Sequence, residues 1–205
     1  AVSEQPYVSQ VWNPDLGNGM YKNPVINADY SDPDVVCVGD DYYMTASSFN
    51  CIPGLPILHS KDLVNWELIG HAVTKLQPKA VFDRPSHGNG VWAPCISYHN
   101  GEFYIYWGDP DYGVFMVKTK DPAGKWEDPV CVIPGKGMID TSPLWDEDGR
   151  VYLVNGWANS RNRFASVITV RELNAEGTKA ISDPVIVFDG NGTENRTCEG
   201  PKFYK

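Results

Sequence analysis

The sequence lacks any long apolar run, and no stretch approaches the roughly 18–20 residues that a membrane-spanning helix needs. It is also short of positive charge, with 17 Lys and Arg against 26 Asp and Glu and a formal net charge of −9. An acidic surface repels phosphate backbones. The sequence therefore argues against a membrane-embedded protein and against a nucleic-acid partner.

Motifs of cofactor-dependent enzymes are absent as well. There is no G-x-x-x-x-G-K-[ST] phosphate loop, no G-x-G-x-x-G fingerprint, no G-x-S-x-G nucleophile elbow and no H-E-x-x-H motif. The four histidines never cluster, and the five cysteines are widely spaced without a C-x-x-C pair. We therefore expect buried free thiols, no structural zinc and no cofactor required for the chemistry.

Aromatic residues and turn formers are what the sequence has in abundance. Of 205 residues, 12% are Phe, Trp or Tyr, and 19 Gly and 16 Pro accompany them. Hydrophobic residues make up 42% and charged residues 21%, which is ordinary for one globular domain with a core. This composition predicts short strands joined by frequent turns, and it argues against a helical bundle.

The first part of the chain differs from the rest. Residues 1–22 are polar and rich in Pro, Asn and Gly, and we expect them to form an extended N-terminal arm before a domain at 23–205. The chain begins Ala-Val-Ser-Glu-Gln-Pro, with no initiator Met, basic segment or apolar signal core. That start is typical of a mature exported protein, secreted or periplasmic in a bacterium, and equally of a trimmed chain.

A turn followed by an aromatic strand recurs three times along the domain. The turns Gly-Asp-Asp, Asn-Gly and Asp-Gly precede the apolar runs at 42–45, 103–107 and 151–154. Further strands are predicted after each run, and the segments 60–66 and 119–126 look like the same loop twice. A period of about 50 to 60 residues is typical of propeller blades, with an irregular β-sandwich as the alternative.

The number of visible units stops short of a closed ring. Three units are complete, and a fourth begins near 200–205. A propeller usually has at least four blades, since an open one leaves an unpaired edge. We therefore expect this sequence to supply about the first three blades and the start of a fourth. The remaining blades would come from the same gene product or from a companion chain.

Three acidic residues share one place in the repeat, just ahead of the predicted innermost strand of a unit. They are Asp32 in Tyr-Ser-Asp-Pro-Asp, Asp140 in Met-Ile-Asp-Thr-Ser-Pro and Glu199 in Cys-Glu-Gly-Pro. In a propeller these strand ends surround the central cavity, so the three carboxylates would converge. Paired carboxylates across a cavity suit hydrolysis of a glycosidic bond. Taken singly, each could be an ordinary turn residue.

Several segments occur in an order that resembles glycoside hydrolase family 43. They lie at 23–34, 39–43, 53–66, 91–94 and 199–201 and include Asp-Pro-Asp, Val-Trp-Ala-Pro and Glu-Gly-Pro. The resemblance extends from about residue 23 to 205. That family contains β-xylosidases, α-L-arabinofuranosidases and arabinanases, and the resemblance implies its fold, an all-β five-bladed β-propeller.

The resemblance also implies a role for each acid. Asp32 matches the general base, Glu199 matches the general acid, and Asp140 matches the acid that orients the proton donor and modulates its pKa. The family inverts the anomeric centre. Inversion implies base and acid carboxyls about 6.5–9.5 Å apart, with room for a water molecule between them.

Aromatic walls are expected around the sugar, because the C–H faces of sugars pack on rings. Phe49 and Trp92 are the candidates, with packing in the core as the alternative. Relatives often carry an aromatic residue near position 51, where this chain has Cys51, so its pocket would have a different shape. Family members often hold a calcium ion on the axis. A structural calcium is therefore possible here, although the sequence assigns it no ligands.

Together these features predict an inverting glycoside hydrolase with a carbohydrate substrate. It would cleave xylosyl or arabinofuranosyl linkages in plant-derived polysaccharides or oligosaccharides. A non-catalytic carbohydrate-binding β-propeller is the main alternative, since it would keep the aromatic residues but would not need three acids in register. A structural or interaction β-domain is a third possibility, in which the three acids would lie far apart.

Overall fold

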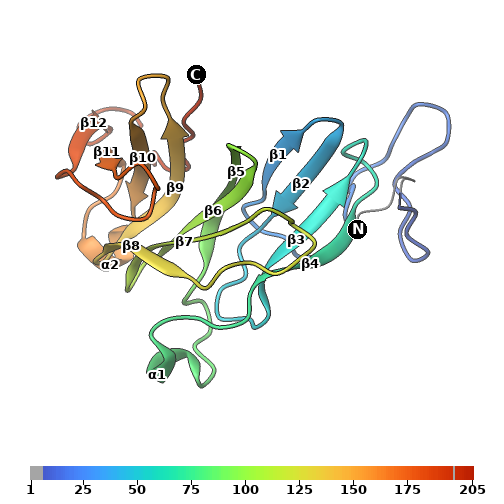
Figure 1. The fold of residues 1–205 in the computed structure, drawn as a ribbon, viewed down its shortest axis with the longest axis horizontal. Helices are drawn as coiled ribbons and strands as arrows, with labels where there is room; N and C mark the ends of the chain where they lie inside the picture. Colours follow the sequence, from blue (N-terminus) through green and yellow to red (C-terminus); the bar gives the residue numbers. More distant parts are fainter. Residues whose placement is uncertain (1–6, 196) are drawn as a thin grey trace.

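The computed structural model describes residues 7–195 and 197–205. Within these residues, twelve strands form three four-stranded antiparallel sheets that lie side by side in chain order (Figure 1). Each sheet is a meander in which consecutive strands pair. In the described part of the chain, no helix has the length and apolarity needed to cross a membrane.

The elements are short. Sheet 1 contains β1 (Asp34–Val38), β2 (Asp41–Thr45), β3 (Gly54–Ser60) and β4 (Glu67–Val73). Sheet 2 contains β5 (Trp92–His99), β6 (Glu102–Asp109), β7 (Gly113–Thr119) and β8 (Val130–Pro134). Sheet 3 contains β9 (Met138–Trp145), β10 (Val151–Trp157), β11 (Val167–Leu173) and β12 (Val185–Asp189). Two four-residue helices, α1 (Lys79–Phe82) and α2 (Asn159–Asn162), lie in loops.

The recurring turns join the first two strands of every sheet, as the repeat predicts. Between β5 and β6, Asn100 and Gly101 have φ values of 49° and 83°, which is the geometry of a tight hairpin turn. Gly39 and Gly149 have positive φ in the corresponding turns of sheets 1 and 3. The predicted all-β fold of repeated units is therefore confirmed, with four strands in each unit.

The core depends on sheet 2, which is buried on both faces. Along β6, Phe103, Ile105 and Trp107 pack in the cluster shared with sheet 1. Tyr104 and Tyr106 point to the other face and pack in the cluster shared with sheet 3. Side chains alternate between the two faces of a strand, so a continuous aromatic run indicates burial on both sides. Sheet 2 therefore joins its two neighbours into one body.

The first strands of the three sheets form the inner edge of the assembly. β1 contacts β5, and β5 contacts β9. At the far side of sheet 3, the outermost strand β12 is exposed along its whole length, including Val185, Ile186 and Val187. The inner strands are therefore the place where loops from all three sheets meet.

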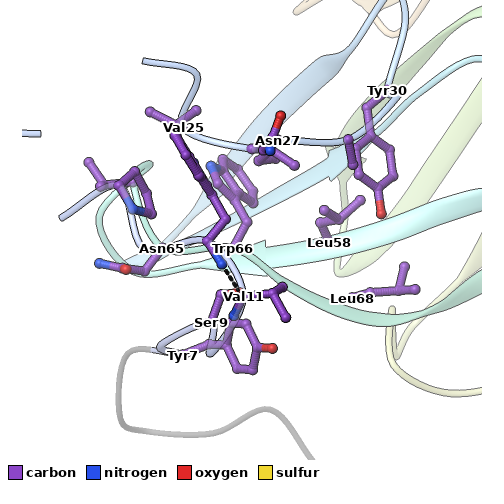
Figure 2. A pocket seen from close by; sticks show the side chains of 15 residues that line it. Tyr7, Ser9, Val11, Val25, Asn27, Tyr30, Leu58, Asn65, Trp66 and Leu68 are labelled. Carbon is purple, nitrogen blue, oxygen red and sulfur yellow. Dashed lines mark hydrogen bonds between the residues drawn. The ribbon is translucent and has the colours of Figure 1, made fainter. Parts of the chain in front are cut away.

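The N-terminal arm packs on sheet 1, although residues 1–6 lie outside the described residues. From Tyr7 onward the arm faces Leu58 of β3 and Leu68 of β4 across a cavity of about 220 Å³ (Figure 2). The indole N–H of Trp12 donates a hydrogen bond to the carbonyl of Pro24 at 2.7 Å. The described part of the arm forms no strand, as its composition suggests.

Three expectations need correction. Asp140 lies inside β9 rather than ahead of it. The segment 197–205, predicted to begin with an inner strand after Glu199, is not a strand, because its partners among the described residues are mostly side chains rather than a backbone ladder. The cysteines are free, but only Cys95 is buried. Cys37 and Cys131 are exposed because they lie on β1 and β8, at the edges of their sheets, where one face is open.

We predict that Gly108→Ala destabilises the contact between sheets 2 and 3. A Cβ at Gly108 would lie 2.5 Å from the carbonyl oxygen of Met138, which is too close for either backbone to avoid by a rotamer change. The expected loss is about 1–3 kcal/mol in the free energy of unfolding, measured by urea denaturation. Gly70→Ala is the matched control, since Gly70 also lies in a strand but a Cβ there meets nothing within 4 Å. Equal stability of the two variants would contradict the prediction.

Candidate active site

The inner-strand ends enclose a cavity of about 360 Å³. Its lining comes from all three sheets and from the C-terminal segment: Asp32, Pro33, Ala93, Pro94, Asp140, Glu199, Gly200, Pro201 and Lys202. The structure thus brings the three acids of the repeat, Asp32, Asp140 and Glu199, to one cavity. Because they come from positions up to 167 residues apart in the sequence, only the meeting of the inner strands can gather them.

A left-handed backbone conformation recurs once near the start of each inner segment: just before β1, inside β5 and β9, and in the segment 197–205. Asp32, Ala93, Asp140 and Gly200 have φ values of 48°, 34°, 56° and 64°. Non-glycine residues rarely adopt this conformation, although Asp does so more readily than most, and it is concentrated at functional sites. All four residues line the cavity. The same bend, repeated once per unit, therefore places these residues at the cavity wall.

Asp32 is held by a serine that the sequence analysis missed. The hydroxyl of Ser47, in the loop after β2, donates to Asp32 Oδ2 at 2.9 Å. The same hydroxyl accepts a hydrogen bond from the backbone N–H of Ala93 at 2.8 Å. Ser47 therefore links the Asp32 carboxylate to the start of β5. No local motif marks this serine, because its partners are 15 and 46 residues away.

Asp140 is bound to the segment that carries Glu199. Its Oδ2 accepts a hydrogen bond from the backbone N–H of Gly200 at 2.8 Å. Burial raises the pKa of Asp140, and the nearby charges of Glu199 and Asp32 raise it further, against the opposing Gly200 hydrogen bond and Lys202. The carboxylate of Asp140 therefore interacts electrostatically with both other acids of the cavity.

Further bonds fix the C-terminal segment on both sides of Glu199. The N–H of Cys198 donates to Ser166 Oγ at 3.2 Å, and the N–H of Phe203 donates to Ser142 Oγ at 3.1 Å. Lys202 forms a salt bridge with Asp34. These contacts reach sheets 1 and 3, so the position of Glu199 depends on both.

The two aromatic candidates lie beside the cavity rather than in its lining. Phe49 lines a second hollow of about 300 Å³ together with Cys51, and this hollow shares Ser47 with the Asp32 network. The backbone of Phe49 exchanges two hydrogen bonds of 3.0 Å with Val91. Phe49 therefore joins the loop after β2 to the loop before β5. Cys51 is exposed in this hollow, where its thiol leaves more space than an aromatic ring.

Trp92 is half-buried and carries an arginine on its ring. The Arg161 guanidinium, from α2 in the loop between β10 and β11, lies 5.4 Å from the Trp92 ring centroid. It donates to both oxygens of Asp111 in the β6–β7 turn, at 2.9 and 3.0 Å, and to Asn89 Oδ1 at 3.3 Å. A bidentate pair of this kind is geometrically specific. Arg161 therefore clamps loops of sheets 2 and 3 around Trp92, at the cavity end of the strands.

Asp109 lies beneath this clamp at the end of β6. It is 2% exposed, and its Oδ1 accepts hydrogen bonds from the N–H groups of Asp111 and Tyr112 at 2.9 and 3.2 Å. Burial raises the pKa of Asp109 to about 6, and the neighbouring Asp111 charge adds to this effect. The turn that holds Arg161 thus contains a carboxylate that titrates near neutral pH.

Metal ligation is not supported by the described residues. Among residues 7–195 and 197–205, no group of three or more His, Cys, Asp or Glu side chains is arranged to hold an ion. The three cavity carboxylates do not form such a group. Calcium also binds backbone carbonyl, amide and water oxygens, so the structural calcium stays an untested expectation, and no step of the chemistry is assigned to it.

Comparison with known proteins decides the family. Residues 21–205 match the family described as glycosyl hydrolases family 43. A beta-xylosidase of Formosa agariphila is 36% identical over 201 residues, covering 93% of this chain. The chain belongs to glycosyl hydrolases family 43. The resemblance seen in the sequence motifs is thereby confirmed.

Other family 43 members extend the similarity to the fold. A non-reducing end alpha-L-arabinofuranosidase of Bacteroides ovatus is 35% identical and covers 94% of this chain. The solved structure of the BlXynB protein of Bacillus licheniformis, 35% identical, superposes with a TM-score of 0.75 over 90% of this chain. The family 43 chain described here spans about a third of the length of these relatives, 33% and 35% of the two enzymes and 36% of the solved chain.

The raised pKa of Asp109 predicts a pH dependence of stability. The folded protein retains a proton on Asp109 up to about pH 6, whereas the ordinary value is 3.8, so stability falls as pH rises between these values. Asp109→Asn keeps an acceptor for the two N–H groups and removes this titration. The variant should therefore gain stability relative to the parent across this interval, by up to about 3 kcal/mol.

Urea denaturation at several pH values from 4 to 7 would measure this difference. Asp128→Asn is the control, since Asp128 is exposed and its hydrogen bond with Lys75 lowers the pKa of Asp128. The Asp128 carboxylate stabilises the folded protein at higher pH, and this effect is lost on acidification. The change in stability caused by Asp128→Asn should therefore depend on pH in the opposite direction to that caused by Asp109→Asn. A parallel pH dependence of the parent and Asp109→Asn would contradict the assignment.

Proposed function

We propose that the protein containing this family 43 chain is an inverting glycoside hydrolase. It cleaves xylosyl or arabinofuranosyl linkages in plant-derived polysaccharides or oligosaccharides. The observation that carries the proposal is the meeting of Asp32, Asp140 and Glu199 around one cavity, in a chain whose relatives are named as xylosidases and arabinofuranosidases. Polymers of this kind occur outside the cytoplasm, so the proposal includes secretion or a periplasmic location.

In the proposed reaction, Asp32 acts as the general base and Glu199 as the general acid. A water oxygen attacks the anomeric carbon while Asp32 accepts a proton from that water. The bond between the anomeric carbon and the glycosidic oxygen breaks, and Glu199 gives its proton to the departing oxygen. One attack from the face opposite the leaving group inverts the configuration. Ser47, which donates to Asp32, would hold the base in place.

Asp140 is assigned to positioning the acid. Its bond to the Gly200 N–H fixes the residue next to Glu199, and its charge lies close enough to interact with Glu199. In this proposal Asp140 orients the segment, and Glu199 delivers the proton to the leaving group. Phe49 and Trp92 are proposed as outer walls for the sugar chain, next to the cavity rather than in it.

The ring is proposed to close as a five-bladed β-propeller. Three sheets are described here, the relatives are about three times as long as this chain, and the outermost strand β12 exposes a row of apolar side chains. We infer that the remaining blades come from the same gene product or from a companion chain.

Ring closure predicts that residues 1–205 expressed alone are poorly soluble or lack glycosidase activity. The same residues with the remaining blades should form a monodisperse and active protein, since the apolar faces are then covered. Size-exclusion chromatography and turnover of an aryl xyloside would measure both properties. Full turnover by a monodisperse monomer of residues 1–205 would show that the proposed number of blades is wrong.

The two catalytic roles predict different responses to the leaving group. Glu199→Ala should lower kcat at least about 100-fold on a substrate with a poor leaving group, because departure then needs protonation. The loss should be under about tenfold on a nitrophenyl glycoside, whose leaving group departs unprotonated. Asp32→Ala should lower kcat on both substrates equally, since water attack is required in each case.

Asp148→Ala is the control for these variants, because Asp148 lies in the β9–β10 turn at the opposite end of the strands. Its turnover should match the parent. The same loss from Glu199→Ala on every substrate would contradict the assignment of the acid. Binding of xylo-oligosaccharides or arabino-oligosaccharides by the parent without turnover would favour the non-catalytic alternative.

A further inference from the structure

Among the described residues that line the cavity, Lys202 is the one cation. It lies three positions after Glu199, on the same segment. Its side chain is 34% exposed, and its Nζ lies 2.7 Å from Asp34 Oδ1. Sequence motifs gave Lys202 no role, and the proposed acid–base steps do not use it.

The partner of Lys202 joins three elements of the protein. Asp34 begins β1, and its side chain is 11% exposed. While Oδ1 binds Lys202, Oδ2 accepts a hydrogen bond from the backbone N–H of Ile96 in β5 at 2.7 Å. One carboxylate thus connects the inner strands of sheets 1 and 2 to the segment that carries Glu199. Removing one partner of a half-buried ion pair leaves the other charge poorly solvated.

Neighbouring groups favour this ion pair in its charged form. Burial opposes the charge on Lys202, but interaction with groups that include Asp34 outweighs burial, and the pKa of Lys202 is raised. The adjacent thiol of Cys95 stays neutral, because burial, with a further contribution from Asp34, raises the pKa of Cys95 to about 11. On its own segment, Tyr204 also favours the charged form of Lys202. At neutral pH Lys202 therefore carries a full positive charge against Asp34.

We propose that Lys202 is a positioning residue for the general acid. Its salt bridge to Asp34 holds the Glu199 segment against sheet 1. The inference rests on the proposed function, since it concerns the same site. The inference assigns a role at this site to Lys202 and to its salt bridge with Asp34, in addition to the three acids.

Two physical effects follow from the geometry. The salt bridge and the Gly200 and Phe203 backbone bonds hold consecutive parts of one short segment. Loss of the salt bridge should loosen this segment, and small misplacements of a catalytic group cost up to about 100-fold in rate. Separately, the positive charge of Lys202 lowers the pKa of Asp140, so loss of that charge should raise this pKa. The pH–rate profile should then move to higher pH.

The experiment uses the protein with all the sequence that naturally flanks residues 1–205. Lys202→Met should lower kcat at least about tenfold on a substrate with a poor leaving group, with KM changed less than about threefold. Its kcat/KM profile should move to higher pH. Lys202→Arg, which keeps the charge, should restore the pH profile and part of kcat.

Lys205→Met is the matched control. Lys205 lies on the same segment and pairs with Asp146, but it is 53% exposed and does not line the cavity. Its kcat and pH profile should equal those of the parent. Asp34→Asn tests the partner, because an amide oxygen can still accept from Ile96 while the charge is lost. If Lys202→Met does not fold, Asp34→Asn and Lys202→Arg carry the test.

Hydrogen exchange separates this inference from the proposed function. Exchange at the amides of Gly200 and Phe203 should be at least about tenfold faster in Lys202→Met than in the parent or Lys205→Met. Faster exchange in Lys202→Met, in a protein whose parent has no glycosidase activity, would overturn the proposed function. It would still support the role of Lys202 in holding the segment. An active parent whose Lys202→Met variant keeps its rate, its pH profile and its slow exchange would overturn the inference.

Discussion

Burial of sheet 2 on both faces is the constraint on which the rest of the structure depends. The side chains of β6 alternate between the cluster shared with sheet 1 and the cluster shared with sheet 3. These two interfaces hold the three sheets side by side, with the inner strands β1, β5 and β9 in contact. The cavity is therefore a product of aromatic packing some distance away from its own carboxylates.

Within the arrangement set by sheet 2, the left-handed bends place particular residues on the cavity wall. Near the start of each inner segment the chain passes through a residue with positive φ, and these residues lie on the cavity wall. Fixing the bends then takes polar contacts between sheets, such as Ser47 to Asp32 and Asp140 to Gly200. Packing thus sets the coarse geometry, and a small number of hydrogen bonds sets the fine geometry.

The sequence was informative where the pattern is local. Turn dipeptides and aromatic runs predicted β2, β6 and β10. The motifs around the three acids predicted their common cavity, although Asp140 lies inside β9 and no strand follows Glu199. Ser47, Lys202 and Arg161 could not be found in this way, because their partners lie 15 to 168 residues away and no spacing rule connects them. The helices α1 and α2 were also missed, since each has four residues and no side-chain cap.

Ala93 occupies the bend of sheet 2 that corresponds to Asp32 and Asp140, yet it carries only a methyl group. Backbone shape and chemical reactivity are thus separable in this architecture. The repeated bend supplies several equivalent wall positions, of which Asp32 and Asp140 carry acids and Ala93 carries none. At such a position, side-chain size can change the fit of a ligand while the reactive groups stay in place. A substitution at Ala93 would therefore alter which ligands fit the cavity, while Asp32, Asp140 and Glu199 stay unchanged.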